Sequence, residues 1–344
     1  MTYHLNNARL ASLLAFCLAS VLFFGSGCGE SNCSPSGRYL VVTPYAGMSN
    51  RLRVLASAKI MAAVTGRQLV VHWAPQENEA PPKWNDLFYN PIPLFEHSLL
   101  ATQDGCSLSD ITRAKEGNPM INNLGSQNDS TKRIHLINLP DVKEPVVYFG
   151  TSMNFKPGET YLSTDEYEAR YRLFYQNLDP MLRVTNDVTA FRKDHGFDQK
   201  YMIGVHYRAW ATGKADERDI KALDREHKYL DGFFAEMRKA MALPLAATDN
   251  KPVAFFLTTD DASIKAKILA MPEFSNRIFT TSYAIDRGSV EGMQNALIDW
   301  FLLGSTEYII GTNSSSFSDE AARLTKQGLT QRRKIRVGEN PFRQ

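Results

Sequence analysis

Apolar residues recur along the chain in short runs that alternate with segments of helical spacing. The first runs, Tyr39–Thr43 and Gln68–His72, predict buried strands, and Asn50–Thr65 between them carries apolar residues near helical spacing. Gly66 follows that segment directly, as a glycine often follows the last residue of a helix. This order of strand, helix and strand predicts that the two strands are parallel.

Residues 74–145 break this pattern, because they are rich in Pro, Asn, Asp and Ser and show no sustained period. A stretch of this length inside a domain is usually functional or poorly ordered, and we expect it to be irregular. After it, Val146–Phe149 predicts another strand. Asp165–Phe191 has a helical pattern that breaks near Asp179 and Pro180.

A second series of alternating strands and helices begins near residue 200. We expect strands at Met202–Tyr207, Val253–Leu257, Arg277–Thr280 and Tyr308–Ile310, and helices at 226–243, 261–270, Gly292–Leu303 and Ser316–Lys326. Alternation at this spacing is typical of a parallel sheet with helices on both faces. The sequence therefore predicts an α/β fold with two Rossmann-like lobes, at residues 34–195 and 196–330, facing across a cleft.

The first 33 residues form a separate segment. Leu10–Gly25 is apolar or small throughout and follows Arg9. At about 1.5 Å per helical residue, this run is shorter than the ~30 Å hydrocarbon core of a membrane, which favours a signal peptide or a short signal-anchor over residues 1–33. Gly27-Cys28 also leaves lipid attachment at Cys28 open. Each alternative places the rest of the chain across a membrane.

Charge and cysteine content further narrow the classes of protein to which the chain could belong. The 39 basic and 37 acidic residues leave a net charge of +2, without the basic stripe that is typical of nucleic-acid-binding proteins. The densest basic run, Arg332–Arg336, predicts a solvated basic tail over residues 331–344. Cys33 and Cys106 could form a disulfide in an oxidising compartment, or could both remain reduced.

Four predicted strands are followed by polar residues, at the ends where parallel strands bind ligands. These polar segments are Gly47–Arg51, His206–Arg208, Asp260-Asp261 and Gly311–Phe317. Singly, each has an ordinary structural explanation, since aspartate and serine cap helices and a histidine on an apolar strand is usually a core residue. Together, they bring an arginine, two carboxylates and a hydroxyl-rich helix start to one edge of a sheet.

This combination predicts a nucleotide site. Arg208 suits a phosphate because a guanidinium binds two phosphate oxygens as a fork, and a helix start at Ser316 favours anions. Asp260 can accept paired N–H groups from the edge of guanine. The chain has no Gly-x-x-x-x-Gly-Lys loop, no Gly-x-Gly-x-x-Gly and no Asp-x-Asp triplet. We therefore expect no cofactor and no metal site, and we expect Arg208 to neutralise the diphosphate.

Four segments resemble a known family. "GMSNRLR", "GVHYR", "FFLTTDD" and "ALIDWFLLGSTEYIIGTNSSSFS" are similar to the motifs of the GDP-fucose-using superfamily, in the same order, between about residues 39 and 325. That group includes the α1,6-fucosyltransferases, the bacterial nodulation fucosyltransferase and the protein O-fucosyltransferases. The resemblance implies the GT-B fold, with an N-terminal acceptor lobe, a C-terminal nucleotide-sugar-binding lobe, and metal-independent transfer with inversion.

The resemblance also implies roles for single residues. Arg208 corresponds to the arginine that binds the β-phosphate, although Ala209 stands where the α1,6 members carry a second arginine. Asp216 lies eight residues past Arg208, where the catalytic carboxylate of the 1,6 type is found, and Glu217 lies beside it. The expected donor-binding residues are Asn50, His206, Arg208, Asp260, Asp261, Ser315, Ser316 and Phe317.

The function expected from the sequence is transfer of fucose from GDP-fucose to a glycan or protein acceptor. Two alternatives stay open: a transferase that uses another GDP-sugar, and a catalytically inactive homologue that binds carbohydrate. The N-terminal segment and the need for an imported sugar nucleotide favour the Golgi or ER lumen, in a single-pass type II membrane protein. A secreted or lipid-anchored form after signal cleavage is the alternative.

Overall fold

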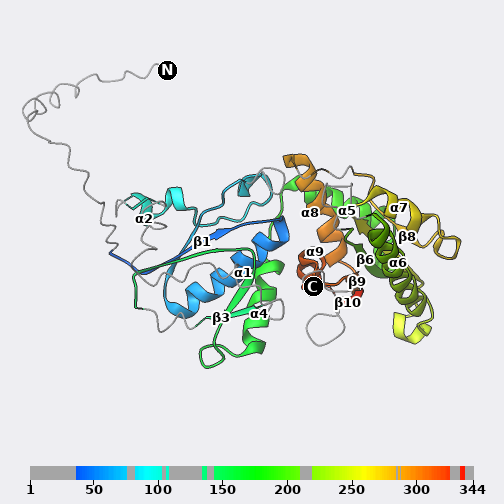
Figure 1. The fold of residues 1–344 in the computed structure, drawn as a ribbon, viewed down its shortest axis with the longest axis horizontal. Coiled ribbons are helices and arrows are strands. Elements are labelled where there is room, and N and C mark those ends of the chain that lie inside the picture. The colour runs from blue at the N-terminus through cyan, green and yellow to red at the C-terminus, as the bar shows by residue number, and fades with distance from the viewer. Residues whose placement is uncertain are drawn as a thin grey trace, which may run out of the picture. The chain divides into compact units, whose positions relative to one another are not determined.

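Two parallel β-sheets, of three and five strands, and a two-stranded parallel ladder form the framework of the described residues (Figure 1). The computed structural model describes residues 36–75, 82–102, 106–107, 143–209, 219–283, 286, 288–325 and 334–337, and at 134–137 and 219–229 only the backbone. The predicted signal segment at 1–33 lies outside these residues. None of the helices described here is long and apolar enough to cross a membrane.

The three-stranded sheet has the order β2-β1-β4. Its strands are β1 (Tyr39–Pro44), β2 (Gln68–Val71) and β4 (Val146–Thr151), and the predicted parallel pairing of the first two is confirmed. Helix α1 (Met48–Thr65) joins β1 to β2, and fourteen of its 18 residues are buried. It ends at Gly66, whose φ of 61° is the left-handed conformation that glycine adopts at little cost.

The five-stranded sheet has the order β10-β9-β6-β7-β8. Its strands are β6 (Tyr201–Tyr207), β7 (Val253–Thr259), β8 (Ile278–Phe279), β9 (Ile309–Thr312) and β10 (Lys334–Val337). Side chains alternate between the two faces of a strand. Tyr201, Ile203 and Val205 therefore pack with helix α6, whereas Met202 packs with helix α8 on the opposite face.

The remaining elements cover or connect these sheets. The helices are α2 (Leu99–Thr102), α4 (Thr164–Gln176), α5 (Leu182–Asp194), α6 (Asp219–Met241), α7 (Ala262–Leu269), α8 (Val290–Gly304) and α9 (Ser316–Ala321). The ladder consists of β3 (Ile134–Ile137) and β5 (Asn154–Pro157), and short 3₁₀ turns lie at Trp84–Asp86, Phe95–His97, Phe197–Gln199, Leu245–Thr248 and Pro272–Phe274. The predicted break between two helices near Pro180 is confirmed.

The C-terminal segment differs from its prediction. Lys334–Val337 is strand β10, which pairs in parallel with β9, so the predicted solvated basic tail is wrong for these four residues. Their alternation explains the difference, because Ile335 and Val337 pack with the core on one face while the two basic side chains lie on the other. Helix α9 is also shorter than predicted and ends at Ala321.

Residues Cys33–Gln344 form one compact unit, and the predicted lobe boundary between residues 195 and 196 stays a prediction. Cys106 is buried and disulfide-bonded, as the sequence allowed. Its predicted partner, Cys33, lies outside the described residues.

A buried polar cluster joins α1, α4 and α9. We call it the Glu320 cluster: Arg53, Tyr171, Tyr175 and Glu320. Arg53 Nε lies 3.1 Å from Glu320 Oε1, while Oε2 accepts hydrogen bonds from the hydroxyls of Tyr171 at 3.2 Å and Tyr175 at 2.8 Å. Burial and the neighbouring Glu320 carboxylate raise the pKa of both tyrosines well above the usual value, so both remain donors. Helix α9, which follows β9, is thereby tied to the N-terminal half of the chain.

Candidate functional site

Arg208 is held at the carboxyl end of the central strand β6. Its backbone N–H donates to Thr312 Oγ1 at 2.9 Å, and its Nη1 forms a hydrogen-bonded ion pair with Asp260 Oδ2. Thr312 ends β9 and Asp260 follows β7, and these two strands flank β6. Groups at the ends of the two flanking strands therefore fix the backbone and the guanidinium of Arg208, whose side chain remains 25% exposed.

Both carboxylate oxygens of Asp260 have partners at the end of β6. While Oδ2 pairs with the guanidinium, Oδ1 accepts a hydrogen bond from the backbone N–H of Ala209 at 2.8 Å. The sequence placed Asp260 beside guanine. The structure gives this carboxylate partners within the protein, in an arrangement that orients the arginine, and a contact with guanine stays a prediction.

His206 lies two residues before Arg208 on the same face of β6. Its ring stacks on Phe317 with the centroids 5.0 Å apart and the planes at 30°. The side chain is only 4% exposed, and among the described residues its Nδ1 has no hydrogen-bond partner. Burial, then the nearby cations Lys334 and Arg208, hold its pKa well below the usual value. His206 is therefore a neutral imidazole beside the arginine.

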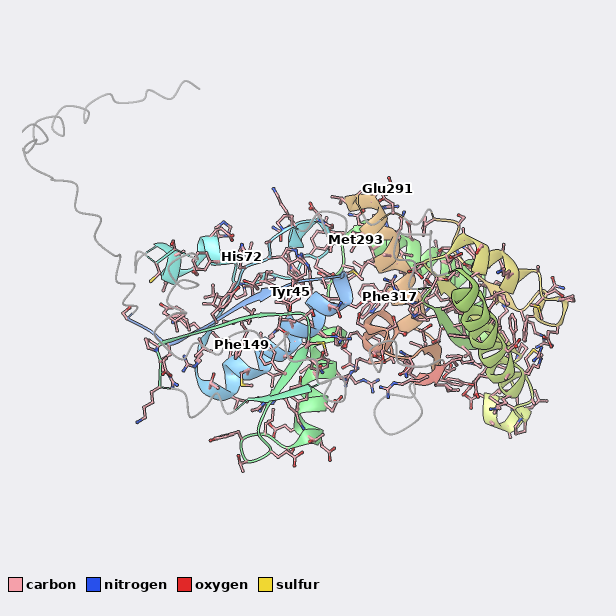
Figure 2. The ribbon with its side chains drawn as sticks, in the orientation of Figure 1. Tyr45, His72, Phe149, Glu291, Met293 and Phe317 are labelled. Atoms are coloured by element: carbon pink, nitrogen blue, oxygen red, sulfur yellow. The ribbon has the colours of Figure 1, made fainter. Side chains whose placement is uncertain are left out.

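The turn after β9, which the sequence predicted to bind the donor, lies beside β6. Thr312 ends β9, Ser314 has a left-handed φ of 65°, and Ser315 directly precedes α9. Ser316 opens that helix, and Phe317 faces the His206 ring. Figure 2 labels Phe317 on the short α9. Because α9 has only six residues, its N-terminus provides less dipole than the predicted longer helix would.

Asp261 is the N-cap of α7. Its Oδ1 accepts hydrogen bonds from the backbone N–H groups of Ser263 at 2.8 Å and Ile264 at 3.0 Å. Burial would raise the pKa of this carboxyl, but these bonds and that of the Ser263 hydroxyl outweigh it and hold the pKa below the usual value. The geometry supports helix capping as the role of Asp261, an explanation that the sequence had left open.

Three other predicted residues are not brought to this site by the described contacts. Asn50 lies within α1 rather than before it, and its backbone N–H donates to the carbonyl of Gly47 at 2.9 Å. Asp216 and Glu217, the predicted catalytic carboxylates, lie outside the described residues. Their roles stay predictions.

Asp299, a half-buried carboxyl on α8, was not among the predicted site residues. Its Oδ2 accepts a hydrogen bond from Thr258 Oγ1 at 2.9 Å, and its Oδ1 accepts one from Thr281 Oγ1 at 2.7 Å. Burial raises its pKa to about 6, against the lowering effect of both hydroxyls. A single acidic residue within the apolar run "ALIDWFLL" was the signal available in the sequence.

No group of three or more His, Cys, Asp or Glu side chains that could hold a metal ion occurs among the residues that the structure describes. The charged groups that the described contacts bring near the end of β6 include Arg208, its partner Asp260, and Lys334 of β10, which contacts the turn after β9 and pairs with Asp319.

Comparisons with known proteins agree with this fold. No family model matches the sequence, and no curated protein matches it. The structure is similar to that of NodZ α1,6-fucosyltransferase co-crystallised with GDP, with a TM-score of 0.55 and 21% identity, covering 85% of this chain and 93% of that one. NodZ from Bradyrhizobium gives a TM-score of 0.54 and 21% identity, covering 85% and 94%.

A third similar structure is NodZ soaked with GDP-fucose, with a TM-score of 0.51 and 20% identity, covering 84% of this chain and 93% of that one. The likeness extends over most of both chains. The α/β fold that the motifs predicted is confirmed. The chain therefore shares the fold of these solved fucosyltransferase structures.

Proposed function

We propose that this protein is a glycosyltransferase that moves fucose from GDP-fucose to a glycan or protein acceptor. The observation that carries the proposal is Arg208 at the ligand-binding end of a parallel sheet, where Asp260 holds its partly exposed guanidinium and Thr312 holds its backbone N–H. The shared fold with NodZ structures prepared with GDP and with GDP-fucose supports the choice of donor. The N-terminal segment would place this activity in the lumen of the secretory route.

The proposed reaction is a single displacement with inversion and without a metal ion. An acceptor hydroxyl oxygen forms a bond to C1 of the sugar, the bond from C1 to the phosphate oxygen breaks, and its electron pair leaves with GDP. The hydroxyl proton passes to a base, for which Asp216 and Glu217 are the candidates. Arg208 donates to the oxygens of the leaving diphosphate, where charge grows most in the transition state.

In this scheme Asp260 is a positioning residue. Its carboxylate fixes the guanidinium before the donor arrives, so that little reorganisation is needed when the charge develops. The same pairing means that an incoming diphosphate shares the guanidinium with Asp260, or takes over its exposed N–H groups. The neutral His206 ring adds no charge of its own beside the diphosphate.

The test is a panel of nucleotides and sugar nucleotides against the purified protein. GDP and GDP-fucose should raise the melting temperature, because a ligand at about 100 times its Kd stabilises a folded protein by about 2.7 kcal/mol. UDP and UDP-sugars at the same concentrations should raise it far less. Equal shifts with GDP and UDP would contradict the guanine preference.

The alternatives differ in what happens to the donor after binding. A transferase that uses another GDP-sugar would release GDP from that sugar nucleotide faster than from GDP-fucose. A catalytically inactive homologue would be stabilised by ligands but would release no GDP from any donor, with or without acceptor. Release of GDP is therefore measured on the same panel.

A further inference from the structure

Lys334, on the edge strand β10, has a buried ammonium that forms hydrogen bonds with the turn after β9 and with α9. Its Nζ donates to the carbonyl oxygens of Thr312 at 2.9 Å and Ser315 at 3.5 Å, and it pairs with Asp319 Oδ1 at 2.9 Å. The side chain is only 6% exposed. An ammonium has three N–H donors, and these three acceptors are enough to engage them, so we assign Lys334 to the protein framework rather than to a phosphate.

The neighbouring strand is shaped to admit this side chain. A Cβ atom at Gly311 of β9 would lie 2.8 Å from Lys334 Cε and 2.9 Å from Ser318 Oγ, closer than packed atoms allow. The lysine stem thus crosses β9 at the one residue that has no side chain, and its ammonium reaches the carbonyl groups just beyond. This fit ties β10 to the segment Thr312–Ser315, which we call the donor turn.

The donor turn also forms a hydrogen bond with Arg208. Thr312 accepts from Lys334 through its carbonyl oxygen and from the backbone N–H of Arg208 through Oγ1, the latter at 2.9 Å. Lys334 also compensates Asp319. Burial would raise the pKa of that carboxyl, but Lys334 and the more distant Arg53 and Arg336 outweigh it and hold the pKa below the usual value. Without Lys334, the buried Asp319 carboxylate would lose this compensating cation, close to a turn that is proposed to meet a diphosphate.

We propose that Lys334 is a positioning residue for the transfer reaction, which fixes the donor turn and, through Thr312, the backbone from which the Arg208 side chain leaves. This inference rests on the function proposed above. It assigns a role in the site to the basic C-terminal segment, at a distance of more than one hundred residues in sequence from Arg208.

The first test does not depend on the donor. Lys334→Met keeps most of the apolar stem and removes the ammonium, and Arg336→Met is the matched control. Arg336 is on the same strand, its side chain is 57% exposed, and its Nε lies 3.8 Å from the same Asp319 oxygen. In Lys334→Met, amide hydrogen exchange across residues 312–318 of the unliganded protein should be at least about tenfold faster, whereas Arg336→Met should match the wild type. Unchanged exchange in Lys334→Met would overturn the proposal.

The second test asks whether Lys334 acts through Arg208. The rate of GDP release from GDP-fucose is measured for Lys334→Met in the wild-type and Arg208→Lys backgrounds. We expect a loss of at least about tenfold in kcat in the wild-type background and a much smaller loss beside Arg208→Lys, since effects of coupled residues are not additive. Equal fold losses in the two backgrounds would show that Lys334 only stabilises the fold.

The two hypotheses fail in different ways. If the wild-type protein neither binds GDP nor releases it from GDP-fucose, the proposed function is wrong, and the exchange experiment still decides whether Lys334 fixes the turn. If Lys334→Met does not fold, Lys334→Gln takes its place in both tests, because its amide keeps two N–H donors and only the charge and length are lost. Its effects should have the same direction and be smaller.

Discussion

Arg208 owes its place to two side chains, one at the end of β9 and one directly after β7. Asp260 holds the guanidinium and the Ala209 N–H, while Thr312 holds the Arg208 N–H. A planar guanidinium can keep its contact with Asp260 and still present N–H groups to a second anion, which a lysine ammonium does with less directional control. Arg208 therefore has a fixed position and can still direct N–H groups at a second anion.

Arg208→Lys tests this geometry. The variant keeps the charge but loses the fork, so we expect kcat for transfer to fall by at least about 10²-fold, as for loss of one preorganised donor. The control is Arg238→Lys, which alters another arginine paired with a carboxylate, Glu273, on the surface formed by α6. The melting temperatures of both variants should stay near that of the wild type. Transfer at the wild-type rate by Arg208→Lys would contradict the proposed role of Arg208 in stabilising the leaving diphosphate.

Asp299 makes stability depend on pH. The pKa of Asp299 is about 6 in the folded protein and 3.8 without the influence of the fold, so the folded state favours the protonated carboxyl. This contribution is fully present below about pH 4 and is lost as the pH rises through 6. Asp299→Asn does not titrate, so its unfolding free energy relative to the wild type should rise by about 1 to 3 kcal/mol between pH 4 and pH 8.

The measurement is urea unfolding of the wild type and Asp299→Asn at a series of pH values. The exposed Asp249, changed to asparagine, controls for the loss of one surface carboxylate. A difference between wild type and Asp299→Asn that is flat from pH 4 to pH 8 would mean that Asp299 ionises as easily in the fold as in the unfolded chain.

At the scale of elements, the Glu320 cluster links helices that are distant in the sequence. Arg53→Met would leave the buried Glu320 carboxylate without its cation, which typically destabilises a protein by about 3 to 5 kcal/mol. The matched control is Arg170→Met, whose partner Glu166 lies one turn away on α4 and whose side chain is 43% exposed. That surface pair should contribute about 0.5 kcal/mol or less. Equal losses in the two variants, measured by urea unfolding, would mean that the cluster adds no stability.

The sequence predicted those elements whose apolar pattern was longer than a few residues. β6, β7 and α8 were predicted within a few residues of their observed bounds, because continuous apolar runs and helical spacing are dictated by burial on both faces of a parallel sheet. β5 was not predicted, since four residues that contain Lys156 and Pro157 carry too little pattern. β10 was misinterpreted because its charges outweighed its alternation.

The candidate site was predictable in position but not in its pairings. Parallel strands bring their carboxyl ends to one edge, so Arg208, Asp260 and the turn after β9 could be placed together from the sequence. That Asp260 would bind Arg208, and that Lys334 would reach Thr312, depends on side chains meeting across strands far apart in the chain. Nothing in local spacing encodes such contacts.

For the whole molecule, the proposed chemistry relies on protein cations. We expect transfer to persist in excess EDTA, because the sequence lacks an Asp-x-Asp triplet and Arg208 is proposed to stabilise the diphosphate in place of a metal ion. The assay compares transfer rates with EDTA, with added Mg²⁺ and with added Mn²⁺. Complete loss in EDTA with recovery on adding either ion would show that the diphosphate is held by a metal ion.

The parallel topology also determines when the site can form. β6 pairs on one side with β7, about fifty residues later in the chain, and on the other with β9, where Gly204 faces Ile309. During synthesis, the edge of β6 that pairs with β9 stays uncovered until β9 has been made. Such long-range pairing is slow and prone to aggregation. Arg208 therefore gains its Thr312 partner late, and refolding yield, rather than equilibrium stability, will set how much active protein is recovered from denaturant.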